Sequence, residues 1–216
     1  MKTWLDKLFG RSSRPEPAQT DTHAESLGAL REHIRSEVAA GFHDEDVILT
    51  GAGDYFTGEI EPALVRREAP RLLREALADH AAAEAGWPEI TDCDRLDAAF
   101  AALEADGVIA RQNFSCCGTC GSTEIWDEIQ AAQDAGLPAR GYAFFHVQDT
   151  ERAVEGEGVY LGYGACDDGE AAALEIGRDI VAELESHGLR TNWDGSWDHR
   201  IGVALDWKKR RGVVRR

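Results

Sequence analysis

Five cysteines are the residues of this chain best suited to chemistry, and three of them share one turn. Residues 116–121 read Cys-Cys-Gly-Thr-Cys-Gly and contain the C-x-x-C-G form of a zinc knuckle. Two thiolates separated by two residues can chelate one ion, and the glycines let backbone amides turn toward the sulfurs. A tetrahedral site needs four ligands, and the sequence has no second C-x-x-C. The remaining ligands must therefore come from single residues.

Cys116, His146 and Cys166 are the candidates for those ligands. Residues 108–114 and 141–147 are predicted strands joined by a full helix, which favours a parallel pair whose carboxyl ends share an edge. The connection to the next predicted strand is only about ten residues long, which favours an antiparallel pair. An antiparallel strand would place Cys166 at the far edge. The predicted metal ligands are therefore Cys116, Cys117, Cys120 and His146, with zinc as the predicted cofactor.

Two other interpretations of the cysteine turn stay open. A strand, a C-x-x-C and a helix also form the thioredoxin arrangement, in which the helix N-terminus lowers a thiol pKa. Three predicted helices precede the strand where a βαβ unit would be expected, and Ser122 is expected to cap the following helix after the second cysteine. Both points argue against a redox site. The plainest interpretation is a tight turn of small buried residues.

His146 and Asp149 form a second candidate constellation, at the end of the strand 141–147. A histidine and a carboxylate can act as an acid–base pair, which would suit a hydrolytic or transfer enzyme. The alternative is that Asp149 caps a short helix and His146 is an ordinary edge residue. Whether the chain is an enzyme stays undecided on the sequence.

The elements that must position these residues fall into an N-terminal helical region and a later sheet. One helix is predicted from the capping-box pattern at Thr22 to Gly41, and another over residues 59–85 with a break at Pro70. A third runs from Thr91 or Asp92 to Gly107. Gly51 and Gly53 indicate a turn. We expect an α/β fold, with α+β as the alternative, in which a mixed sheet of about five strands with flanking helices follows the helical region.

The predicted organisation has five segments, and the two ends are the most unusual. Residues 1–10 form a short amphipathic peptide, 11–21 a flexible linker, 22–90 the helical region, 91–208 the α/β domain with the cysteine turn, and 209–216 a basic tail. The peptide is suited to docking on a protein partner or a membrane surface. The tail, which with Lys208 holds six of the 23 basic residues, is expected to fold back on the acidic body or to meet an acidic partner.

Composition limits the function classes. The fractions of hydrophobic and charged residues, 43% and 29%, are those of a globular protein. A net charge of −17 repels phosphate backbones, so no nucleic-acid binding is expected. There is neither an apolar run long enough to cross a bilayer nor a secretory signal, which predicts a cytoplasmic protein with reduced cysteines.

Three segments together resemble a bacterial family of uncharacterised proteins, described only as a domain of unknown function. They are residues 96–126 with the CCGTCG turn, residues 144–150 with the sequence FFHVQDT, and residues 205–207 with the sequence LDW. The resemblance covers roughly residues 91–208 and implies no activity and no catalytic residue. The functional prediction therefore depends on the cysteine turn: a metal-binding or thiol-bearing protein with a regulatory or interaction role, or alternatively a plain protein-interaction module.

Overall fold

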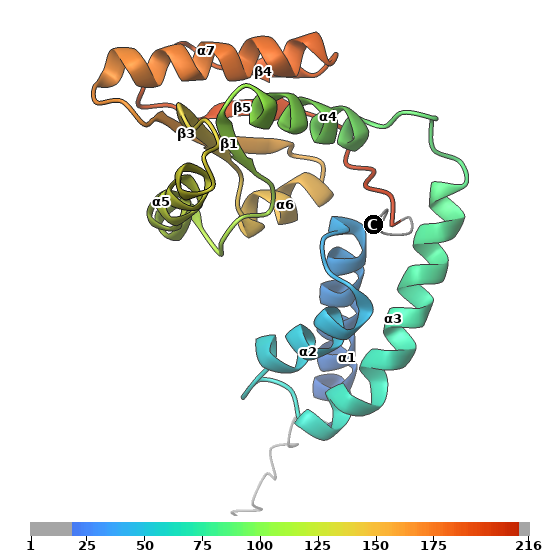
Figure 1. Cartoon of the computed structure of the whole chain (residues 1–216). Helices are drawn as coiled ribbons and strands as arrows, with labels where there is room; N and C mark the ends of the chain where they lie inside the picture. Colours follow the sequence, from blue (N-terminus) through green and yellow to red (C-terminus); the bar gives the residue numbers. More distant parts are fainter. Residues whose placement is uncertain (1–18, 212–216) are drawn as a thin grey trace, which may run out of the picture.

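A computed structural model describes residues 19–211, with side chains from residue 23 onward. The predicted amphipathic peptide, most of the predicted linker and the end of the basic tail lie outside these residues. Within them, helices come first and a mixed sheet with helices follows, as predicted (Figure 1). The elements are α1 Gln19–Ala40, α2 Glu45–Tyr55, α3 Pro62–Glu84, α4 Asp92–Ala105, β1 Val108–Arg111, α5 Gly118–Asp134, β2 Gly141–Phe144, α6 Val147–Val154, β3 Val159–Ala165, α7 Glu170–Ser186, β4 Arg190–Asn192 and β5 Ile201–Ala204.

The helical region is more continuous than the sequence suggested. Helix α3 runs through Pro70 without a break, and Gly51 and Gly53 lie inside α2 instead of a turn. Helix α1 begins before Thr22, so that residue is not its cap. The reason for the first two corrections is tertiary packing. Helices α1, α2 and α3 share one buried core, which offsets the hydrogen bond lost at Pro70 and the low helix propensity of the glycines. Its largest fully buried side chains are Leu30, Ile34, Ile48, Leu72 and Leu73.

The sheet has five strands in the order β1-β2-β3-β5-β4 in the described part of the chain. Strands β1 and β2 are parallel, and every other neighbouring pair is antiparallel. Both predictions about the strands near the cysteine turn are therefore confirmed. The carboxyl ends of β1 and β2 meet at one edge, whereas β3 runs the opposite way.

Helices cover the two faces of the sheet unequally. Helices α4 and α7 pack on one face, and the core between them and the sheet includes Leu96, Phe145, Leu161 and Ile180 (Figure 1). Helix α5 covers the opposite face beside β1 and β2, where Ile125 is completely buried. The cysteine turn thus belongs to the α5 face, at the carboxyl edge of the parallel pair.

The C-terminal segment 205–211 folds back across the chain and joins its two regions. The Trp207 indole donates a hydrogen bond to the carbonyl oxygen of Ala39 at 3.0 Å, at the end of α1. The Lys209 ammonium lies 2.9 Å from the carboxylate of Asp97 on α4. Residues 209–211 of the basic tail therefore contact the acidic body, one of the two alternatives for the tail. No helix in residues 19–211 has the length and apolar character needed to cross a membrane.

Candidate metal centre

The cysteine turn forms the N-terminus of α5. Cys117 is the N-cap in an extended conformation, and the helix begins at Gly118. The prediction that Ser122 caps this helix was wrong: its hydroxyl lies inside the first turns and donates to the carbonyl oxygen of Gly118 at 2.8 Å. Cys120 is therefore part of the helix, which removes one of the two sequence arguments against a redox site.

Close contact with the sheet accounts for the early start of α5. A Cβ atom on Gly121 would lie 2.4 Å from the Phe144 ring on β2, well inside van der Waals contact. Because glycine has no Cβ, the first turn of α5 can lie directly on that ring. Gly121, the last residue of the C-x-x-C-G pattern, is thus the point at which α5 contacts the sheet.

The loop that leads into the turn has an unusual backbone. Asn113 and Ser115 have φ angles of 50° and 62°, and they are the non-glycine residues with positive φ in the described part of the chain. The start of α6 holds both: the Thr150 hydroxyl donates to the Asn113 side chain at 2.7 Å, and the Val147 amide donates to the Ser115 carbonyl at 3.1 Å. Such conformations persist only where surrounding contacts determine them, and they are concentrated at functional sites.

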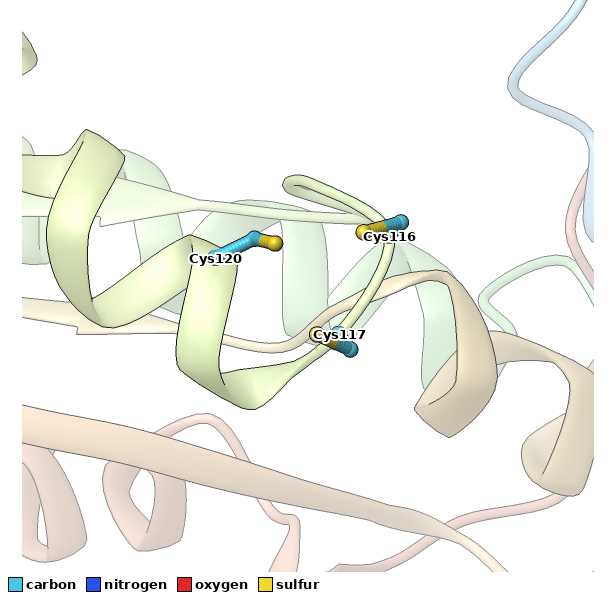
Figure 2. A group of neighbouring side chains, drawn as sticks. All are labelled: Cys116, Cys117 and Cys120. Atoms are coloured by element: carbon cyan, nitrogen blue, oxygen red, sulfur yellow. The ribbon is translucent and has the colours of Figure 1, made fainter.

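The three cysteines of the turn bring their sulfurs together. The sulfur atoms of Cys116, Cys117 and Cys120 all lie within 4.8 Å of one another. Figure 2 shows Cys116 on the loop and Cys120 on the first turn of α5, with their sulfurs directed toward each other. Cys116 is exposed and the other two are partly exposed, so solutes can reach the group. This arrangement can hold a metal ion.

The thiols of this group differ in acidity. The pKa of Cys117 is lowered, first by the backbone N–H of Cys120 and then by the Cys120 thiol. The pKa of Cys120 is raised to about 11, chiefly by the neighbouring sulfurs of Cys116 and Cys117. Sulfurs this close disfavour one another's charge, and a bound cation would remove that penalty.

His146 lies beside the turn but is engaged elsewhere. It is the N-cap of α6, and a Cβ atom on Gly118 would lie 3.6 Å from its Nε2 atom. Its Nε2 atom is 3.1 Å from a carboxylate oxygen of Asp149. Among the described residues, the cluster of side chains close enough to share a metal ion consists of the three cysteines and does not include His146. That His146 completes a metal site therefore stays a prediction, although the topology brings it to the predicted edge.

An ion pair between Arg200 and the buried Asp149 lies beside His146. Asp149 is completely buried, and Arg200, the residue before β5, reaches it with its Nη1 atom 3.1 Å from Oδ1. Arg200 also donates to the carbonyl oxygen of Tyr160. Burial lowers the pKa of His146, against the raising effect of Asp149. Sequence reasoning missed Arg200, because nothing in its local sequence indicates a partner 51 residues away.

The other two cysteines lie away from the turn. Cys166 follows β3 at the edge where Ala165 pairs with Gly141, the start of β2, so it is at the opposite edge from His146. Cys93 is a buried residue of α4, and burial raises its pKa to about 12. The expectation that Cys166 is remote from the site agrees with this topology.

Comparison with known proteins identifies a family whose function is unknown. No curated protein and no solved structure matches the chain. One family model, described as "Domain of unknown function (DUF6891)", matches residues 23–211, which include both the helical region and the α/β region. The chain therefore belongs to this family of unknown function.

Proposed function

We propose that the turn of Cys116, Cys117 and Cys120 binds a thiophilic metal ion, with zinc as the first candidate. The observation that carries this proposal is the mutual approach of the three sulfurs within 4.8 Å. Thiolates on a tetrahedral zinc ion lie about 3.8 Å apart, because each Zn–S bond is about 2.3 Å long. Small rotations of three short side chains would close that difference. Soft sulfur ligands favour zinc and copper(I) over magnesium or calcium.

The position of the turn supports a preformed site. The loop before it is held by α6, and the turn itself begins α5, where unpaired backbone N–H groups favour negative charge. A thiolate at Cys117, the N-cap of α5, is therefore stabilised before the ion arrives. A site organised in this way loses less conformational entropy on binding.

Three sulfurs leave the fourth position of a tetrahedral ion to another ligand. His146 is the predicted ligand from this chain, and it would have to exchange its contact with Asp149 for the ion. A side chain from a protein partner could take the position instead, which would give the site a regulatory or interaction role. The proposal requires reduced thiols, as expected in the cytoplasm.

Zinc competition is the direct test. Reduced, metal-free protein is titrated with zinc against a chromogenic chelator, and the bound metal is counted by elemental analysis. We expect one zinc per chain, and binding that weakens as the pH falls because thiolates take up protons. Cys117→Ser and Cys120→Ser should each weaken binding by at least about tenfold, whereas Cys166→Ser, the matched control, should not.

Two outcomes would contradict the proposal. Protein that cannot compete with the chelator has no zinc site, and equal losses in the Cys117→Ser and Cys166→Ser variants would mean that the turn is not where zinc binds. His146→Gln tests the fourth ligand separately. Weaker binding in that variant supports His146, and unchanged binding leaves the position to water or a partner.

The two alternative functions have less support. Asp149 is enclosed and bound by Arg200, which favours a role in orienting His146 over proton transfer to a substrate. Of the two segments suggested for partner docking, the N-terminal peptide lies outside the described residues, and residues 209–211 contact the chain itself. The metal proposal is therefore the one with a built site.

A further inference from the structure

The cluster of Cys116, Cys117 and Cys120 is also suited to a thiol reaction that needs no metal ion. We propose that, in the metal-free protein, Cys117 and Cys120 form a reversible disulfide on reaction with a hydroperoxide, so that oxidation removes the metal site. Cys117 is the attacking thiolate and Cys120 the resolving thiol. This inference rests on the proposed function, because it concerns the same cysteines, and it adds a way in which metal binding is regulated.

Geometry excludes one pair among the three sulfurs, and the start of α5 favours Cys117 with Cys120. Cys116 and Cys117 are neighbours joined by a trans peptide, so their Cα atoms are about 3.8 Å apart, too close for an unstrained disulfide, which needs about 4.4–6.8 Å. Cys117 and Cys120 are the N-cap and a first-turn residue of α5, three positions apart on one side of the helix start. Their sulfurs are within 4.8 Å, and χ1 rotations can bring them to bonding distance.

The start of α5 assigns the two roles. Cys117 is the N-cap of α5, where backbone N–H groups that no helical carbonyl uses stabilise a negative charge on its sulfur. Cys120 lies inside the first turn of the helix, three residues further along. Cys117 is thus placed to react as the thiolate, and Cys120 is placed to resolve the intermediate.

The reaction balances with the hydroperoxide as the oxidant. The Cys117 thiolate attacks one peroxide oxygen, the O–O bond breaks, and the leaving alkoxide or hydroxide takes up a proton from the buffered solvent. The Cys120 sulfur then attacks the sulfenic sulfur, the S–O bond breaks, and the thiol proton leaves with the hydroxide as water. Two electrons pass from the two sulfurs to the peroxide. Only the Cys116 thiol of the group remains, which cannot hold the ion alone.

The remaining cysteines provide internal references. Cys93 is buried and should react only after unfolding. Cys166 is partly exposed but lies at the opposite edge of the sheet, where the described residues contain no other cysteine. The structure therefore predicts one intramolecular disulfide per chain, with Cys93 and Cys166 left as thiols.

The test is peroxide oxidation of the full chain after metal removal. Reduced protein is treated with one equivalent of hydrogen peroxide, alkylated, unfolded and mapped by mass spectrometry. We expect a Cys117–Cys120 disulfide that a reducing agent reverses, formed at least about tenfold faster than oxidation of Cys166. Cys116→Ser should form the same disulfide at a rate within about twofold of the original. Cys120→Ser should stop at a Cys117 sulfenic acid that dimedone traps.

Three results would overturn the inference: a Cys116–Cys120 disulfide, a disulfide that still forms in Cys120→Ser, or oxidation no faster than at Cys166. Zinc competition on the same preparation separates this inference from the proposed function. Protein that binds zinc but forms no disulfide refutes only the switch. Protein that forms the disulfide but binds no zinc refutes only the metal site.

Discussion

The ion pair between Arg200 and Asp149 is the contact beyond the cysteine turn whose removal should be most informative. Arg200→Met keeps most of the volume of the side chain but leaves the Asp149 carboxylate, which is completely buried, without its cation. Asp149→Asn removes the charge instead and leaves Arg200, whose side chain is 37% exposed, able to reach water. The two variants should therefore differ in stability although they break the same pair.

The magnitudes follow from the burial of the two partners. Breaking a buried ion pair by removing one partner costs about 3–5 kcal/mol, and the partial exposure of Arg200 places Arg200→Met at the lower end, about 3 kcal/mol. That loss corresponds to a fall in melting temperature of about 9 °C for a chain of this size. Asp149→Asn should cost only about 1–2 kcal/mol, because the remaining cation is solvated. The double variant should cost less than the two single variants together, because Arg200→Met is costly chiefly through the buried charge.

Urea unfolding followed by tryptophan fluorescence measures these free energies. Arg178 on α7 is exposed and has no ion pair among residues 23–211, so Arg178→Met is the matched control and should stay within about 0.5 kcal/mol of the original protein.

Two results would refute this reasoning. Equal losses in Arg200→Met and Asp149→Asn would show that the buried carboxylate does not govern the cost. Additive losses in the double variant would show that the two side chains do not interact. Since Arg200 also donates to Tyr160, additive losses would assign its contribution to that carbonyl group instead.

The remaining predictions concern packing and acid stability. Gly121→Ala should destabilise the protein by at least about 2 kcal/mol and disturb the turn, because its Cβ would overlap Phe144. Gly51→Ala in α2, where an added Cβ atom would have nothing within 4 Å, should be neutral or stabilise the protein by about 0.5–1 kcal/mol in the same unfolding assay. Equal effects of Gly121→Ala and Gly51→Ala would contradict the overlap with Phe144. Lowering the pH from 7 to 5 should reduce stability, because histidines with lowered folded-state pKa values take up protons more readily when unfolded. Histidine-to-glutamine variants should lose less stability between pH 7 and pH 5 than the original protein. An unchanged dependence of the unfolding free energy on pH would refute this explanation. These histidines are His33, His80 and His146.

Connection lengths and local signals in the sequence determined much of the architecture. A full helix between two strands predicts a parallel pair, and a short connection predicts an antiparallel one, so the edge shared by the turn and His146 followed from the chain alone. The sequence also placed the ends of α4 near Thr91 and Gly107, where the structure has a capping box and a glycine with positive φ. The three sulfurs of the turn are close because their residues are neighbours in sequence.

Only the tertiary structure decided where α5 begins, that α3 passes through Pro70, and which cation binds Asp149. The start of α5 depends on the contact of Gly121 with Phe144, and α3 is continuous because a shared core offsets its proline. Arg200 reaches Asp149 across 51 residues. Each of these outcomes is set by contacts between distant segments, whose energies outweigh local propensity once the chain has folded, and no short stretch of sequence contains them.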